Sequence, residues 1–213
     1  MRQRLVRLPA PVPLACAALA LAAAAGCVSL KRTPEARFFV LRALAEPPTL
    51  PQPPASFRLV GMLPVRIPGY LDRAQLVTWT HPGELRVDEF LRWAEPLDTA
   101  ITRTLAEDLD TLLPETHVIR APWAAGVKPR CRVRVGLTQF GPQTDGEVRL
   151  EGRYVLLPAG DEKPLAVRPV SLRRGPLAGP ASDPGAGVEA MSELLRDLAR
   201  EIAGVIREIP PEG

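Results

Sequence analysis

Two neighbouring segments, residues 130–140 and 147–157, alternate apolar and charged side chains with a period of two. This period is typical of β-strands that bury one face and expose the other. The segments therefore predict a hairpin with one charged face and one apolar face, and the apolar face needs a cover of other apolar surface. The predicted apolar members are Cys131, Val133, Val135, Leu137, Val148, Leu150, Tyr154 and Leu156.

The cover is predicted from two stretches whose apolar residues recur at helical spacing. One runs from about Pro96, a favourable first helical residue, to Pro114, and the other carries Met191 and is stopped by Pro210. Further strands are predicted over residues 37–44, 57–65, 75–80, 84–90, 116–120 and 165–172. The expected fold class is α+β: a mostly antiparallel β-sheet with two amphipathic helices packed on one face, in a single domain.

Two segments are predicted to be connections between these elements. Residues 46–54 contain five prolines, which favours an extended, semi-rigid chain. Residues 175–187 are rich in glycine and proline, which predicts a flexible loop before the last helix.

The amino terminus has the layout of a secretory signal peptide. Arg2, Arg4 and Arg7 precede a short apolar run over residues 14–25, and small residues end that run. An uncleaved membrane anchor is the alternative, but a span needs about 20 apolar residues. Extending the run back to that length meets prolines at positions 9, 11 and 13, which break helices.

The sequence Ala24-Ala25-Gly26-Cys27 resembles the bacterial lipobox, with alanine at position 24 where leucine is favoured. That motif implies that the Cys27 thiol accepts a diacylglyceryl group and becomes the new amino terminus. An ordinary signal peptide that contains a cysteine is the alternative. We therefore expect residues 1–26 to be a lipoprotein signal peptide, 27–36 a lipidated tether and 37–213 the folded domain. Val28, in place of the aspartate typical of inner-membrane retention, indicates the outer membrane.

Removal of residues 1–26 changes the charge and the cysteine count of the chain. The full sequence has 27 Lys and Arg against 24 Asp and Glu, and the three arginines of the signal account for the whole excess, since 27 − 3 = 24. A neutral mature chain without a basic run interleaved with aromatics argues against nucleic-acid binding. Cys131 would then be the only cysteine besides Cys27, so no internal disulfide is expected.

The usual signatures of catalysis and of metal binding are not found in the sequence. The two histidines, His81 and His117, belong to no cluster with metal-ligand spacing, and no nucleophile elbow or phosphate-binding loop occurs. We interpret His81 as an exposed turn residue and His117 as a partly buried hydrogen-bonding group. Cys131 falls on the apolar face of its strand, so a buried, unreactive thiol is expected. A periplasmic hydrolase would have to use Asp72, His81 and His117, which are scattered along the chain.

Several charged residues have both a structural and a functional interpretation. Asp72 and Arg73 form either a structural ion pair or cap between two strands, or a binding pair. The acids of the first predicted helix are expected to be its solvated side, since the opposite side is apolar. These acids are Asp98, Glu107, Asp108 and Asp110.

Three segments carry a resemblance to a known family. They are residues 65–77 (VRIPGYLDRAQLV), residues 92–97 (RWAEPL) leading into the first helix, and residues 37–41 (RFFVL) shortly after the lipobox. In this order the chain resembles the PqiC-type, or ABC-transport auxiliary, lipoproteins over nearly all of its mature length.

The resemblance implies a function without catalysis and without a cofactor. It implies a lipid-anchored protein on the periplasmic face of the outer membrane, with an MCE-domain protein and inner-membrane transporter subunits as partners. The implied role is an accessory one in moving phospholipid or other hydrophobic cargo and in supporting membrane integrity. The loop from Gly69 to Arg73, with Tyr70, Leu71, Asp72 and Arg73, is the expected partner or subunit contact, and homo-oligomer formation stays open. The alternative is an envelope-structural or assembly lipoprotein that binds a barrel protein or peptidoglycan.

Overall fold

Eight strands in two sheets are found in the computed structural model, which describes residues 34–44, 58–160, 163–175 and 183–209. The three-stranded sheet has the order β1-β4-β3 and the five-stranded sheet the order β5-β2-β6-β7-β8. The strands are β1 (Arg37–Phe39), β2 (Arg58–Met62), β3 (Gln75–His81), β4 (Glu84–Trp93), β5 (Thr116–Arg120), β6 (Cys131–Pro142), β7 (Val148–Pro158) and β8 (Ala166–Arg174).

The predicted hairpin is confirmed as β6 and β7, the longest antiparallel pair in the fold. Cys131 lies opposite Pro158 at one end and Pro142 opposite Val148 at the other, with a register shift between Leu137 and Gln139. Along β6 the side chains before this shift alternate between buried and solvent-facing positions, as the period of two predicts. The charged face of the hairpin stays open to solvent, with Arg134 and Arg153 exposed.

The α+β class is confirmed, and the sheets are mixed. β3–β4, β6–β7 and β7–β8 are antiparallel, whereas β1–β4, β2–β5 and β2–β6 are parallel. Parallel neighbours need a long crossover connection. The chain between β2 and β5 provides one, because it contains the hairpin β3–β4 and the first helix.

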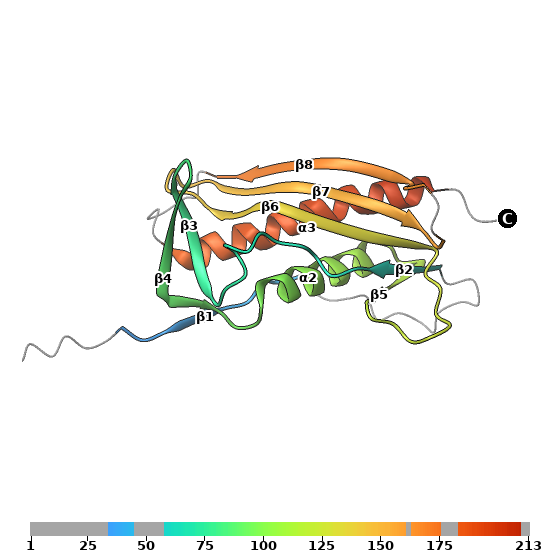
Figure 1. The fold of residues 1–213 in the computed structure, drawn as a ribbon, viewed down its shortest axis with the longest axis horizontal. Coiled ribbons are helices and arrows are strands. Elements are labelled where there is room, and N and C mark those ends of the chain that lie inside the picture. Colours follow the sequence, from blue (N-terminus) through green and yellow to red (C-terminus); the bar gives the residue numbers. More distant parts are fainter. Residues whose placement is uncertain (1–33, 45–57, 161–162, 176–182, 210–213) are drawn as a thin grey trace, which may run out of the picture. The chain divides into compact units, whose positions relative to one another are not determined.

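Two helices, α2 (Leu97–Leu112) and α3 (Pro184–Glu208), cover the apolar side of the five-stranded sheet. α3 packs against β6, β7 and β8, and α2 packs against α3 and β5 (Figure 1). The fully buried side chains at this contact come from both layers and include Phe140, Leu150, Tyr154, Leu156, Ile101, Leu105, Leu195 and Leu198. The hydroxyl of Tyr154 donates to Glu201 of α3 at 3.1 Å, so its polar atom is satisfied within this contact.

The boundaries of several predicted elements are corrected by the structure. The first strand ends at Phe39, because residues 40–44 leave the sheet for the helices. The expected loop over 175–187 ends at Asp183, whose side chain caps α3 by accepting from the Gly185 amide, with Pro184 as the first helical residue. The rest of that loop, residues 176–182, lies outside the described residues.

The predictions for the amino terminus also fall outside the described part of the chain. They are the signal peptide over 1–26, the lipidated Cys27, the tether up to residue 33 and the proline-rich connection over 46–54. The described residues from Glu35 onward belong to one compact unit. None of the helices in the described residues is long and apolar enough to cross a membrane.

The close approach of β7 to the bulge in β6 depends on a glycine and generates a stability prediction. A Cβ on Gly152 would lie 2.8 Å from the Leu137 Cα and still closer to the Gly136 carbonyl oxygen, whereas a Cβ on Gly136 would meet no atom within 4 Å. We expect Gly152→Ala to lower the free energy of unfolding by about 1–3 kcal/mol in urea titrations. Gly136→Ala is the matched control and should change it by less than about 0.5 kcal/mol. Equal effects of the two substitutions would contradict this packing.

Candidate functional site

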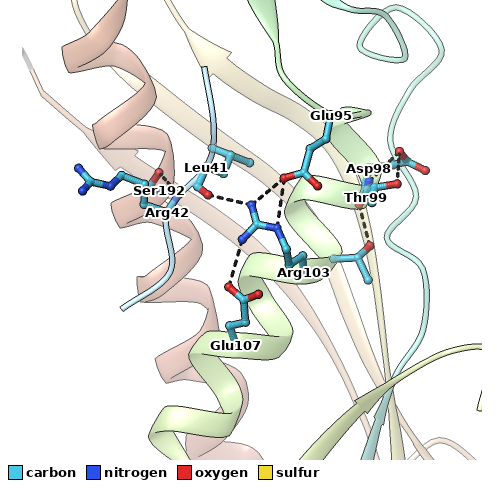
Figure 2. Close-up of polar contacts among 9 residues, drawn as sticks. Leu41, Arg42, Glu95, Asp98, Thr99, Arg103, Glu107 and Ser192 are labelled. Atoms are coloured by element: carbon cyan, nitrogen blue, oxygen red, sulfur yellow. Dashed lines mark hydrogen bonds and ion pairs between the residues drawn. The ribbon is translucent and has the colours of Figure 1, made fainter. Parts of the chain in front are cut away.

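The segment that follows the predicted tether is fixed to both helices. We call residues 37–44 the anchor-proximal segment, because it joins the predicted lipid anchor to the folded domain. The side chain of Leu41 in this segment is fully buried. Backbone atoms of the segment form hydrogen bonds with side chains of α2 and α3 (Figure 2). Backbone groups are the main points of attachment, so the segment is fixed through its peptide bonds as well as by apolar packing.

Arg103 of α2 makes the central contact of this attachment. Its Nη2 donates to the Leu41 carbonyl oxygen at 3.0 Å and to Glu95 at 2.7 Å, its Nε donates to the same Glu95 oxygen at 3.1 Å, and its Nη1 donates to Glu107 at 3.1 Å. The hydrogen bond that Arg103 donates to Glu95, together with the charges of Glu107 and Glu95, raises the pKa of Arg103 above its usual value against the opposing effect of burial. Charge-assisted bonds of this kind have about twice the strength of neutral ones.

Two further backbone amides of the anchor-proximal segment bond to helix side chains. The Arg42 amide donates to Ser192 Oγ at 3.1 Å, and this hydroxyl donates in turn to the Val188 carbonyl of α3. The Leu44 amide donates to Asp108 Oδ1 at 2.6 Å. The segment is therefore bonded to α2 at two points and to α3 at one.

The expectation that Asp108 lies on the solvated side of its helix is wrong. Its side chain is fully buried, and its second carboxylate oxygen has no hydrogen-bond partner among the described residues. Burial is the largest influence on its pKa and raises it, while the Leu44 amide and the charges of Arg196 and Arg200 act in the opposite direction. Position 108 follows Leu105 by three residues, so the helical spacing places it on the apolar stripe.

The three segments that carried the family resemblance, residues 37–41 in the anchor-proximal segment, 65–77 and 92–97, are joined by backbone hydrogen bonds. The Ala94 amide donates to the Phe39 carbonyl at 2.9 Å, and the Trp93 amide donates to the Ala74 carbonyl at 2.7 Å. Residues 92–97 therefore connect the anchor-proximal segment on one side with the end of the 69–73 loop on the other. Glu95 of the same segment completes the connection through Arg103.

The loop over residues 69–73 exposes two charged side chains, Asp72 and Arg73, next to two residues that are packed in place, Tyr70 and Leu71. Leu71 is buried, and the hydroxyl of Tyr70 donates to the Thr138 carbonyl while the Tyr70 ring stands edge-on to Trp79 with centroids 5.5 Å apart. Burial, and then the charge of Glu151, raises the pKa of Tyr70. Asp72 and Arg73 are exposed, and within the described residues neither side chain forms an ion pair or a hydrogen bond. The structural ion pair or cap that the sequence favoured for them is thus not formed.

The candidate catalytic groups of the sequence are not assembled into one site. His81 ends β3 beside Glu84 at 3.1 Å, and His117 in β5 lies 3.2 Å from Asp110. His117 is exposed, not partly buried as expected. The thiol of Cys131 is buried, and burial raises its pKa to about 11, so at neutral pH it is protonated and shielded. Among the described residues no group of three metal-ligating side chains comes together.

A pocket of about 350 Å³ lies where the carboxyl ends of α2 and α3 meet β2 and β6. Its wall combines apolar side chains such as Val60 and Ile206 with Arg58, Arg130 and Arg207. Arg207 donates to the Leu112 carbonyl, and Arg130 to the Ile209 carbonyl, each at 2.7 Å. The volume is at the lower end of the range for small-molecule sites and too small to enclose a lipid with two acyl chains.

Removal of Arg103 tests how the anchor-proximal segment is held. In Arg103→Leu we expect faster hydrogen exchange in residues 41–44 by about ten-fold or more and a loss of about 1–3 kcal/mol in the free energy of unfolding, because Glu95 and the Leu41 carbonyl lose their partner. Arg149→Leu is the matched control, since Arg149 is similarly enclosed and pairs with Asp145 and Glu147. It should leave exchange in residues 41–44 unchanged. If residues 41–44 exchange hydrogen at the same rate in Arg103→Leu and Arg149→Leu, Arg103 does not hold this segment.

The buried Asp108 predicts a pH dependence of stability. Because its pKa is raised in the folded protein, the folded state binds this proton more readily than the unfolded state, and stability gained from this group increases as the pH falls. We therefore expect the stability of the natural protein relative to Asp108→Asn to increase as the pH is lowered from about 7 to about 4. Urea titrations of both proteins across this interval give the difference, in which groups common to both cancel. A difference that stays constant, or that decreases toward low pH, would contradict the prediction.

Comparisons with known proteins identify the family of this chain and show the same fold in solved structures. The family model described as "ABC-type transport auxiliary lipoprotein component" matches residues 39–203. Among solved structures, one called an uncharacterized protein is similar with a TM-score of 0.67 and 21% identity, over 81% of this chain and 99% of that one. Protein XCC0632 from Xanthomonas campestris is similar with a TM-score of 0.62 and 18% identity, over 81% and 96%. No curated protein matches the sequence. The chain belongs to the family of ABC-type transport auxiliary lipoprotein components, the PqiC-type lipoproteins.

Proposed function

We propose that this protein is a non-enzymatic accessory subunit of an MCE-type lipid transport system, anchored through Cys27 to the periplasmic face of the outer membrane. The family supplies the transport accessory role and the lipoprotein character. The outer membrane, the MCE-domain partner, the inner-membrane transporter subunits and the hydrophobic cargo belong to the proposal. In this role the domain docks a partner near the membrane and takes no part in bond making or breaking.

One observation supports this function above the others: a charged, exposed loop is joined by short hydrogen bonds to the segment that leads to the lipid anchor. The path runs from Ala74 at the base of the loop to Trp93, and from Ala94 to Phe39. A partner bound at Asp72 and Arg73 would therefore be held at a fixed position relative to the anchored end of the domain. An accessory subunit that positions a transport conduit at a membrane needs this property, whereas an enzyme needs an assembled reactive site.

The charge pattern of the loop favours a protein partner. Asp72 and Arg73 have opposite charges, are exposed, and have no partner within the described part of the chain. Complementary charges at the rim of an interface set orientation and association rate more than total affinity. Leu71 beneath them is already buried, so the loop offers a polar contact on a rigid base and not an apolar one.

The loop proposal is tested by capture of the MCE-domain partner on immobilised protein. The charge-reversal variant Asp72→Lys with Arg73→Glu should reduce the captured amount about ten-fold, with a smaller reduction for the double alanine variant. His81→Ala with Glu84→Ala is the control, because this exposed pair ends a different turn and its ion pair contributes little to stability. Full capture by an Asp72→Ala and Arg73→Ala variant of natural stability would refute the loop as the contact.

The alternative function is that of an assembly or structural lipoprotein of the envelope. The identity of the captured partner in the same experiment distinguishes this function from the transport role. A barrel protein or peptidoglycan fragments in place of an MCE-domain protein would favour it. Genes for an MCE protein and an integral membrane subunit beside this gene would favour the transport role.

A further inference from the structure

Two apolar side chains of the anchor-proximal segment point away from the domain. Phe38 is 64% exposed and Val40 is 48% exposed, whereas Leu41 is fully buried and Phe39 is partly buried against the core. The alternation arises because successive side chains of an extended chain point to opposite sides. These two neighbouring side chains on one side of an extended segment form a small apolar surface, and covering it with another apolar surface is favourable.

We propose that Phe38 and Val40 insert into the interfacial region of the same bilayer that holds the lipid anchor. The proposal rests on the anchor at Cys27 that the proposed function includes. It adds a second membrane contact, made by the folded domain itself, and it thereby assigns the domain a fixed orientation on the membrane. We call these two side chains the membrane wedge.

The length of chain between the anchor and the wedge limits their separation. Phe38 follows Cys27 by 11 positions, and an extended chain covers at most about 3.6 Å per residue, so the wedge cannot be more than about 40 Å from the acylated residue. Any shorter path brings it closer. Among the described residues, the wedge is the exposed apolar surface with the shortest chain connection to Cys27. The other large apolar side chains of that part of the chain that are strongly exposed, Leu165 and Val167, lie before and in β8.

The charges around the wedge suit a phospholipid surface. Arg37 lies over the Phe39 ring, 5.3 Å from its centroid, and Arg42 is exposed, with Glu189 at 4.0 Å as its ion-pair partner. Glu35, two residues before the anchor-proximal segment, is the one acid in the described residues 34–44. Arginines that flank apolar side chains at an interface can reach the anionic headgroups while their neighbours enter the acyl boundary.

A second copy of this chain is a less suitable occupant of the same surface. β1 is the edge of its sheet, but it has three residues, which is too short to template a stable added strand. The rigid hold on Leu41, Arg42 and Leu44 also favours insertion, because the wedge loses little conformational freedom when it enters the bilayer.

The test places a fluorescent probe in the wedge of the acylated protein. The full lipoprotein with Val40→Cys, labelled with an environment-sensitive fluorophore, is reconstituted into vesicles of phosphatidylethanolamine and phosphatidylglycerol that contain nitroxide-labelled lipid. The label is selective, because Cys131 is buried and its thiol is unreactive and Cys27 is acylated. We expect a blue-shifted emission and at least two-fold quenching by the nitroxide, and at least two-fold weaker quenching when Phe38→Ser is added.

The control is Val167→Cys, whose site is 55% exposed on β8, at the far side of the domain from β1 in Figure 1. Its probe should not be quenched. Mass spectrometry of the same preparation reports acylation at Cys27 and so tests the proposed anchor separately. With the anchor present, an unquenched probe at position 40 overturns the membrane wedge. A blue shift without quenching also overturns it and indicates a protein interface, including one with a second copy.

Discussion

The guanidinium of Arg103 joins the anchor-proximal segment, which is distant in the sequence, to the chain just before α2 and to α2 itself. It bonds to the Leu41 carbonyl of the anchor-proximal segment, to Glu95 in the segment before α2, and to Glu107 one turn further along its own helix. A planar group with five donors can satisfy all three at once, which a lysine could not do in the same geometry. Arg103 therefore stabilises the attachment of the anchor-proximal segment and the entry into α2 together, beside the backbone bonds of Phe39, Arg42 and Leu44.

The contacts of Arg103 fix the anchor-proximal segment to the domain, so a small surface on the domain can hold a partner at a set position relative to the proposed lipid anchor. The exposed pair Asp72 and Arg73 stands at the end of a series of backbone bonds that begins in the anchor-proximal segment. Asp108 also attaches the anchor-proximal segment to α2. A buried carboxylate whose second oxygen has no partner among the described residues lowers the stability of the folded state by itself. Its bond to the Leu44 amide offsets part of that cost and fixes the point where the chain leaves the helices.

Period and spacing in the sequence predicted much of the fold. The hairpin β6–β7 and the two helices follow from apolar residues repeating at two and at about 3.6 positions, and these are local properties of the chain. The parallel pairings of β2 with β5 and β6 could not be predicted in the same way, because they join segments separated by a hairpin and a helix. The end of β1 at Phe39 was missed for a related reason: the residues after it are apolar enough for a strand but bond to helix side chains.

The candidate site was predictable only in part. The loop with Asp72 and Arg73 was identified from its resemblance to a family, but the absence of an ion pair between them depends on side-chain directions that no sequence pattern specifies. Arg103 was missed because an arginine among acids on a helix is ordinarily a solvated residue. Asp108 had a detectable signal, since its position falls on the apolar stripe of its helix.

Photo-crosslinking in intact cell envelopes tests the central claim most directly. A photoreactive amino acid at position 72 samples the proposed docking loop. A second one, at position 153, samples the open charged face of the sheet, because the Arg153 side chain is also exposed. We expect the MCE-domain protein to be captured from position 72 and not from position 153, as identified by mass spectrometry. Capture from position 153 alone, or capture of only a barrel protein or peptidoglycan from position 72, would contradict it.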